Sequence, residues 1–213
     1  MEKHIHINIG RQIGAGGLEV ARELGKRLDI RVYDKELLTL AAKESGLDHS
    51  VFAREDEKDN LSMNTGFSFS SFAEAITNTF RPSVYNSNTI FTIQSQVIRR
   101  LAEEGSTIFV GRCADYVLRD FEGCISVFIT SSMEDRIHRI RTINKYGDTQ
   151  GVSDDKLADL LEKGDRKRAS YYGDYTFKTW GAAESYDMCL STSLLGVDGC
   201  ADIIEETIRR RLL

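Results

Sequence analysis

Apolar residues along the chain follow two alternating periods, one typical of strands and one typical of helices. The strand pattern recurs at residues 4–9, 30–33, 107–110, 125–129 and 186–190. Between these runs, apolar residues lie three and four positions apart, the spacing of amphipathic helices. This spacing predicts helices over residues 18–28, 35–43, 71–80, 87–104, 132–145, 153–171 and 197–211. Strands that alternate with helices predict parallel βαβ units and therefore a doubly wound α/β fold.

Residues 46–86 differ in composition from the rest of the chain. They are rich in Asn, Ser and Thr, contain the run Gly66-Phe-Ser-Phe-Ser-Ser-Phe72, and carry the single proline, Pro82. We interpret this stretch as an inserted subregion; the alternative is a surface excursion that packs through its phenylalanines. A length of 213 residues otherwise corresponds to one domain, residues 1–213.

The composition narrows the classes of function. Apolar residues make up 41% and charged residues 29%, as in soluble globular proteins. The formal net charge of −5 disfavours nucleic acid as a partner, which calls for a basic surface. No apolar run reaches the ~18 residues of a membrane helix, so we expect no membrane partner. The composition gives no preference for an oligomeric state.

The cysteines and the first residues of the chain bear on its compartment. The four cysteines form no C-x-x-C pair, which disfavours a structural zinc site and a redox dithiol. Residues 1–10 lack the apolar stretch of a signal peptide. Scattered thiols fit a reducing compartment, and we expect a cytoplasmic protein.

A glycine-rich turn joins the first predicted strand to the first predicted helix. It reads Gly10-Arg-Gln-Ile-Gly-Ala-Gly-Gly17. The helix N-terminus presents unpaired N–H groups to this turn, and glycines let an anion approach the backbone. The turn therefore predicts a phosphate-binding site formed by Arg11, Gly14, Ala15, Gly16 and Gly17.

Two nucleotide-binding motifs match this turn in part. The dinucleotide fingerprint begins at Gly14 and Gly16, and Asp34 suits a ribose hydroxyl, but Glu19 replaces the third glycine. The phosphate-loop motif requires Gly-Lys-[Ser/Thr], whereas Gly17 stands in place of the lysine. A third interpretation is a tight strand-to-helix turn with no ligand.

Several arginines favour phosphoryl chemistry, because a guanidinium binds phosphate through two parallel hydrogen bonds. Arg112 directly follows the predicted strand 107–110, and Arg166 and Arg168 lie in a basic run. Ligands of doubly wound sheets bind at the carboxyl ends of the strands. Arg136 and Arg139 lie three apart on a predicted helix, where a solvated face paired with nearby acids is the alternative.

Six segments, in the expected order over nearly the whole chain, resemble the cytidylate kinase-like family of P-loop nucleoside monophosphate kinase relatives. They are Gly10–Gly17, Val32–Leu37, Phe109–Asp115, Glu134–Ile140, Asp165–Tyr172 and Tyr186–Leu190. The resemblance implies a five-stranded parallel sheet in a three-layer α/β/α, P-loop kinase-like fold. It also implies a nucleotide-monophosphate-binding insertion at about residues 46–86 and a lid at about residues 160–180.

The resemblance further implies an activity and a set of site residues. The activity is Mg²⁺-assisted transfer of the γ-phosphoryl group of ATP to a small nucleotide acceptor, CMP among the candidates. Asp34 and Lys35, with Arg112, match the acceptor site. The residues that match the catalytic arginines and the lid are Arg112, Asp165, Arg166 and Arg168.

The chain departs from true cytidylate kinases in the phosphate loop. Gly17 cannot supply the loop lysine's charge, and Glu19 stands near the position of the Mg²⁺-binding Ser/Thr, so no metal ligand is assigned. We expect Arg11, the cation within the loop, to replace the lysine in part. The alternative is a catalytically inactive nucleotide-binding pseudokinase.

Overall fold

A computed structural model of the protein describes residues 4–34, 87–143, 149 and 151–212. Within these residues, five strands form one parallel sheet in the order β2-β3-β1-β4-β5. The strands are β1 (His6–Arg11), β2 (Arg31–Tyr33), β3 (Thr107–Val110), β4 (Cys124–Thr130) and β5 (Met188–Ser191). The doubly wound α/β prediction is therefore confirmed, and all five predicted strands are present.

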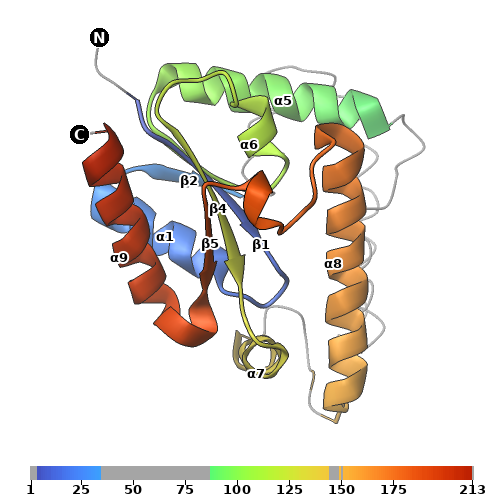
Figure 1. The fold of residues 1–213 in the computed structure, drawn as a ribbon. Helices are drawn as coiled ribbons and strands as arrows, with labels where there is room; N and C mark the ends of the chain where they lie inside the picture. The colour runs from blue at the N-terminus through green and yellow to red at the C-terminus, as the bar shows by residue number, and fades with distance from the viewer. Residues whose placement is uncertain (1–3, 35–86, 144–148, 150, 213) are drawn as a thin grey trace, which may run out of the picture.

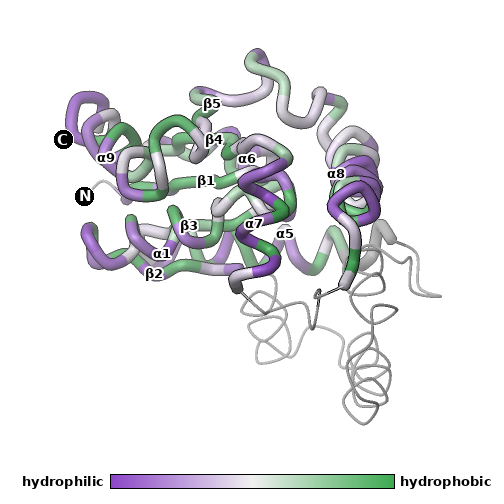
Figure 2. The backbone as a smooth tube through the Cα atoms, turned by 90° about the horizontal axis from the view of Figure 1, so that it is seen from below, coloured by the Kyte–Doolittle hydropathy of each residue, from purple (hydrophilic) through white to green (hydrophobic). Residues whose placement is uncertain are grey.

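Helices cover both faces of this sheet. They are α1 (Gly17–Leu28), α5 (Ser87–Glu104), α6 (Ala114–Val117), α7 (Met133–Ile143), α8 (Asp154–Thr176) and α9 (Thr192–Leu212), with a short 3₁₀ turn η1 (Ala183–Ser185). Helices α1 and α9 lie on one face, and α5, α6 and α8 lie on the other (Figures 1 and 2). The three-layer α/β/α architecture is thus observed. Helix α7 lies beyond the carboxyl end of β4 (Figure 1).

The helix boundaries differ from the predicted ones at a few places. Helix α8 continues to Thr176, where Phe177 in a left-handed conformation caps it. Helix α9 includes Gly196 with φ 69° and ψ 179°, so the regular helix begins after that residue, as the sequence predicts. The predicted helices 35–43 and 71–80 and the predicted insertion 46–86 lie outside the described residues.

The side chains of β1 alternate between the two layers of helices, because successive side chains of a strand point to opposite faces. Ile7 and Ile9 are fully buried with the apolar faces of α1 and α9. His6 and Asn8 are buried on the opposite face, and Gly10 follows them on that face. This second face is packed by α5, α6 and an aromatic cluster, and it leads to the pocket described below.

In the described part of the chain, no helix is long and apolar enough to span a membrane.

Candidate functional site

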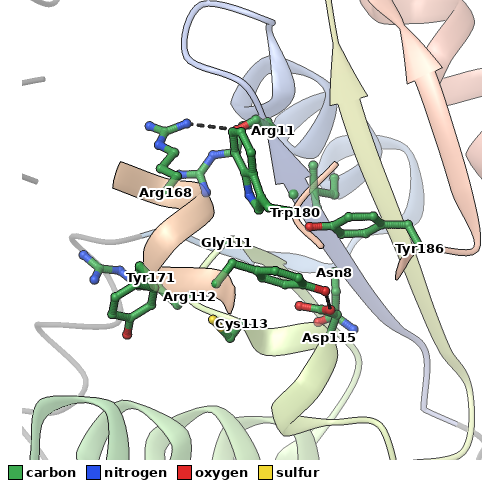
Figure 3. Close-up of a pocket in the computed structure, with 13 residues that line it drawn as sticks. Asn8, Arg11, Gly111, Arg112, Cys113, Asp115, Arg168, Tyr171, Trp180 and Tyr186 are labelled. Carbon is green, nitrogen blue, oxygen red and sulfur yellow. Dashed lines mark hydrogen bonds between the residues drawn. The ribbon is translucent and has the colours of Figure 1, made fainter. Parts of the chain in front are cut away.

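A pocket opens at the carboxyl ends of β1 and β3, on the face of the sheet that carries α6 and α8 (Figure 3). It encloses about 440 Å³, including its open mouth. Its lining comes from β1, from the residues that follow β3, from α8, and from the segment before β5. The lining residues are Asn8, Ile9, Gly10, Arg11, Gly111, Arg112, Cys113, Asp115, Arg168, Tyr171, Tyr172, Trp180 and Tyr186.

The glycine turn leads from β1 into α1, and two of its glycines are required by their conformation. Gly14 and Gly16 have φ of 76° and 81°, in the left-handed region that glycine adopts without strain. Both also face arginines of α7. A Cβ on Gly14 would lie 2.9 Å from the carbonyl oxygen of Arg136, and one on Gly16 would lie 3.1 Å from Cζ of Arg139. The turn is therefore packed tightly beneath α7.

The side chain of Arg11 crosses from the glycine turn to the end of β3. A Cβ on Gly17 would lie only 2.6 Å from Cβ of Arg11, so this side chain fills the space beside Gly17. At its other end, Nη1 of Arg11 lies against Gly111, so a side chain at position 111 would have to displace the guanidinium. Arg11 thus occupies the space that a lysine at position 17 would need.

A buried ion pair holds the turn from outside the pocket. Asp165 on α8 accepts a hydrogen bond from the N–H of Ile13 at 2.9 Å, and Nε of Arg136 donates to the carbonyl oxygen of Ile13 at 2.7 Å. Asp165 and Arg136 are themselves joined at 2.5 Å. Burial raises the pKa of Asp165, while the nearby Arg136 opposes this shift. Arg139 adds a further hydrogen bond to the carbonyl oxygen of Gly14 at 2.8 Å.

Arg136 and Arg139 are therefore not a solvated helix face. Arg136 is only 3% exposed, and the solvated interpretation is wrong for it. Arg139 is half-buried. Two arginines three positions apart lie on the same face of a helix. Their spacing does not show whether that face is exposed to solvent or covered, as here, by the glycine turn.

The two predicted lid arginines lie on different sides of α8. Arg168 lines the pocket and donates to the carbonyl oxygen of Arg11 at 3.0 Å. Arg166 is exposed and pairs with Glu162 one helical turn earlier. Asp165, as described above, points to the glycine turn. The structure thus brings Arg168 to the pocket and places Arg166 on the solvent side of the same helix.

Arg112 lies in the pocket wall on an unusual stretch of backbone. Gly111, Arg112 and Cys113 have consecutive positive φ angles of 80°, 61° and 55°. Two of these residues are not glycine, and each such residue costs about 1–2 kcal/mol. Strained backbone of this kind gathers at functional sites, where the rest of the fold compensates for it.

Aromatic side chains close the pocket. Tyr172 and Tyr186 stack with centroids 5.8 Å apart, and Trp180 packs edge-on against Phe128 at 4.9 Å. Tyr172 also donates to Oδ2 of Asp115 at 2.7 Å. Burial raises the pKa of Asp115, and the Tyr172 hydrogen bond opposes the shift. On the outer side, Tyr175 stacks on Phe91 of α5 at 4.1 Å, which joins α8 to the core.

The remaining predicted site residues lie at or beyond the edge of the described structure. Asp34 directly follows β2 and is half-buried. Lys35 lies outside the described residues. Among the described residues, no three His, Cys, Asp or Glu side chains gather into a possible metal site.

Sequence reasoning missed several residues that shape this site. Asn8, Asp115 and Tyr186 line the pocket, while Arg136, for which the sequence left a phosphate role and a solvated face open, holds the turn. A signal was present for Asn8, because a polar residue between Ile7 and Ile9 in a central strand must be buried on the opposite face. The role of Arg136 depends on contacts 123 positions apart in the sequence, which no local pattern shows.

Comparisons with solved structures find the same fold. A protein from Eubacterium ventriosum described as uncharacterized aligns with a TM-score of 0.70 and 27% identity, over 98% of this chain and all of that chain. Shikimate kinase from Bacteroides thetaiotaomicron aligns with a TM-score of 0.55 and 13% identity, over 96% of this chain and 98% of that one. The shikimate kinase of Acinetobacter baumannii, solved in complex with shikimate, aligns with a TM-score of 0.50 and 15% identity, over 100% of this chain and 97% of that one. At these identities the two kinases show a shared P-loop kinase fold.

The family is shown by the sequence itself. No curated protein matches the chain. Residues 6–194 match the cytidylate kinase-like family, a range that includes the glycine turn, the pocket and all five strands. The protein therefore belongs to the cytidylate kinase-like family.

Proposed function

We propose that the protein is a nucleotide-dependent phosphotransferase of the nucleoside monophosphate kinase type, which transfers the γ-phosphoryl group of ATP to a small acceptor, with CMP as the first candidate. One observation carries this proposal. Arg11, Arg112 and Arg168 come from three separate segments and line one pocket beside the glycine turn. Phosphoryl transfer needs positioned groups and neutralised charge more than covalent chemistry from the protein, and converging arginines supply both.

In this proposal Gly14 to Gly17 of the glycine turn, which lie beside the pocket and do not line it, bind the phosphates of ATP. Gly14, Ala15, Gly16 and Gly17 lead into the N-terminus of α1, where backbone N–H groups and the helix dipole favour an anion. Arg139 lies against this turn and adds positive charge. When bound, ATP supplies the phosphoryl group, and Mg²⁺ neutralises part of its charge. Mg²⁺ commonly binds through substrate phosphates and one or two carboxylates, so a cage of protein ligands is not required.

In this proposal the arginines have separate roles. Arg11 takes the place of the loop lysine, Arg112 binds the acceptor, and Arg168 holds the phosphates from α8. Asp34 and Lys35 border the acceptor at the end of β2, as the family resemblance implies. Asp165 acts as a positioning residue through Ile13, and Arg166 remains the expected second lid arginine.

A catalytically inactive pseudokinase is the second candidate, and one observation favours it. Gly17 has no room for the lysine of the phosphate-loop motif, and Glu19 follows where a Ser/Thr would bind Mg²⁺. A protein that has lost these groups could still bind a nucleotide through the backbone of the turn.

Phosphoryl transfer from ATP with Mg²⁺ to CMP, dCMP, UMP, AMP, GMP and TMP tests the proposal. We expect turnover on one acceptor, reduced about 100-fold or more in Arg112→Ala and Arg168→Ala, as for other arginines that stabilise a transferring phosphoryl group. Arg100→Ala, which removes an exposed partner of Glu104 on α5, is the control for loss of a surface arginine. The same assay on Arg166→Ala tests its lid role.

The outcomes separate the two candidates. A thermal shift with ATP but no turnover on any acceptor would favour the pseudokinase. If the protein shows no turnover on any acceptor and no thermal shift with ATP, both candidates are excluded.

A further inference from the structure

A buried amide lies at the inner end of the pocket with no hydrogen-bond partner. Asn8 is only 3% exposed, and neither its Oδ1 nor its Nδ2 is hydrogen-bonded within the described residues. It lines the pocket, as Asp115 does, and both are labelled in the close-up view (Figure 3). Buried polar groups in proteins are almost always paired, so an unpaired one calls for a partner from elsewhere. The pocket is where such a partner can enter.

A second polar group lies at the same end of the pocket. Asp115 accepts a hydrogen bond from Tyr172, whose side chain is buried. An ionised carboxylate has about four acceptor positions and no donor. The Tyr172 hydroxyl and the nearby Lys178 favour the ionised form of Asp115, and a ligand group that contacts this form donates a hydrogen bond, as a hydroxyl or an amine does. The amide of Asn8 can both donate to and accept from the same group.

The walls and the mouth of the pocket restrict the ligand further. Gly10 lacks a side chain, and the ring of Tyr186 lies over it, 3.0 Å from where a Cβ would be. This ring and Trp180 form a narrow aromatic wall. Among the lining residues, three arginines outnumber the single carboxylate, so the pocket attracts an anion.

We propose that Asn8 and Asp115 form the specificity-determining floor of the acceptor pocket, and that the acceptor is a small anion carrying a hydroxyl or amine that donates a hydrogen bond to Asp115. The anionic group lies toward the arginines, and the donor group lies at the floor. This inference rests on the proposed function, because it treats the pocket as the acceptor half of the site. Two kinds of compound share this chemistry: nucleoside monophosphates, and hydroxylated anions without a base.

Binding to the purified full chain tests the inference, with calorimetry and thermal shift as readouts. One arm uses CMP, UMP, AMP and GMP. The other uses ribose 5-phosphate and quinate, which have hydroxyls but no base. Inorganic phosphate serves as an anion without such a group. The variants are Asn8→Leu, of similar size but without hydrogen-bonding atoms, and Asp115→Asn. Tyr116→Phe, on an aromatic residue that packs near the pocket but does not line it, is the control.

We expect a compound from one arm to bind more tightly than inorganic phosphate. Asn8→Leu and Asp115→Asn should each weaken it about tenfold or more, the usual effect of losing a hydrogen bond to a buried or charged group. Tyr116→Phe should change the dissociation constant less than about twofold, since a substitution away from the site leaves its contacts intact. Apart from a weak interaction with the Cys124 thiol, the Asn8 amide has no hydrogen bond to lose within the described residues, so Asn8→Leu should melt at or above the wild-type temperature without ligand.

Two results would overturn the inference: wild-type affinity in both folded variants, or no binding by any compound of either arm. If Asn8→Leu does not fold, Asp115→Asn decides alone. ATP binding is measured in parallel and should be the same in all variants. A different result is that the wild type binds a compound of one arm, with weaker binding in both variants, and yet does not bind ATP. That result would reject the kinase proposal and leave this inference standing.

Discussion

Asp165 and Ile13 are joined by a hydrogen bond across 152 positions of the sequence, from the backbone N–H of Ile13 to the carboxylate of Asp165 at 2.9 Å. The carbonyl oxygen of the same residue accepts from Arg136, which pairs with Asp165. Both polar groups of one residue in the glycine turn are thus held by side chains of α7 and α8. The shape of the turn therefore depends on helix α8, the same helix that carries Arg168 into the pocket.

Replacement of Asp165 by alanine should destabilise the protein strongly. It leaves the buried guanidinium of Arg136 and the N–H of Ile13 without their partner, at a cost of about 3–5 kcal/mol. Urea unfolding followed by circular dichroism measures this difference. The matched control is Glu162→Ala, which breaks an exposed pair on the same helix and should cost less than about 1 kcal/mol.

The double variant Arg136→Met with Asp165→Leu separates charge from packing. Apolar replacement of a buried pair commonly restores stability, so the double variant should recover much of the loss. If Asp165→Ala were as stable as Glu162→Ala, the buried pair would not hold the turn.

Arg11→Ala should weaken ATP binding by more than about tenfold, or about 1.4 kcal/mol. The reason is position: the side chain of Arg11 fills the space beside Gly17, where the phosphate-loop motif has its lysine. Isothermal calorimetry measures the dissociation constant, and Arg11→Lys should retain part of the affinity because it keeps the charge. An unchanged dissociation constant in Arg11→Ala would reject this role.

Restoring the lysine of the motif should harm the protein. In Gly17→Lys the new Cβ would lie 2.6 Å from Cβ of Arg11, which is not a flexible side-chain end. Overpacking of this kind costs about 1–3 kcal/mol. We expect a lower melting temperature and no gain in ATP binding, measured by thermal unfolding and calorimetry. The pair Gly17→Lys with Arg11→Gly, which removes the Cβ that the new side chain would meet, should regain part of the lost stability if the clash is the cause.

The sequence predicted the five strands of the sheet and the five longer described helices, because these elements have clear local patterns, but it did not predict the short helix α6 or the 3₁₀ turn η1. Residues 107–110 show this best: a compact apolar run followed by Gly111-Arg112 indicated both a buried strand and a site at its end. The partners of the turn were not predictable in this way. Arg136, Asp165 and Ile13 meet only because α7 and α8 pack beside the turn, and their separations in sequence carry no periodic signal.

At position 112, glycine should give a more stable protein than alanine. Arg112 has φ 61°, a conformation that costs any residue with a Cβ about 1–2 kcal/mol. Arg112→Gly should therefore be more stable than Arg112→Ala by up to about 1 kcal/mol, after the entropy cost of glycine in the unfolded chain. Both should lose phosphoryl transfer equally, since both lack the guanidinium. Equal stability in chemical denaturation would show that the backbone at this position is unstrained.

Stability should fall between pH 7 and pH 5 because of His6. Its ring is 2% exposed, and Nδ1 lies 2.9 Å from the hydroxyl of Thr107. Burial, with a smaller effect of His4, lowers the pKa of His6 from 6.5 to about 4. The unfolded chain therefore binds a proton at this ring more readily than the folded protein does. The contribution of the neutral His6 ring to the free energy of unfolding is complete above pH 6.5. It is lost as the pH falls toward 4, with a loss of about 2 kcal/mol by pH 5.

Urea unfolding of the wild type and of His6→Gln at pH 7.5 and pH 5.0 measures this effect. The comparison between the two proteins removes the contributions of all other titrating groups, since both chains share them. Glutamine has no proton to gain in this range and can still hydrogen-bond to Thr107. We expect the free energy of unfolding of His6→Gln to fall less than that of the wild type, by about 2 kcal/mol, as linkage requires. Equal losses in the two proteins would mean that His6 gains its proton as readily in the folded protein as in the unfolded chain.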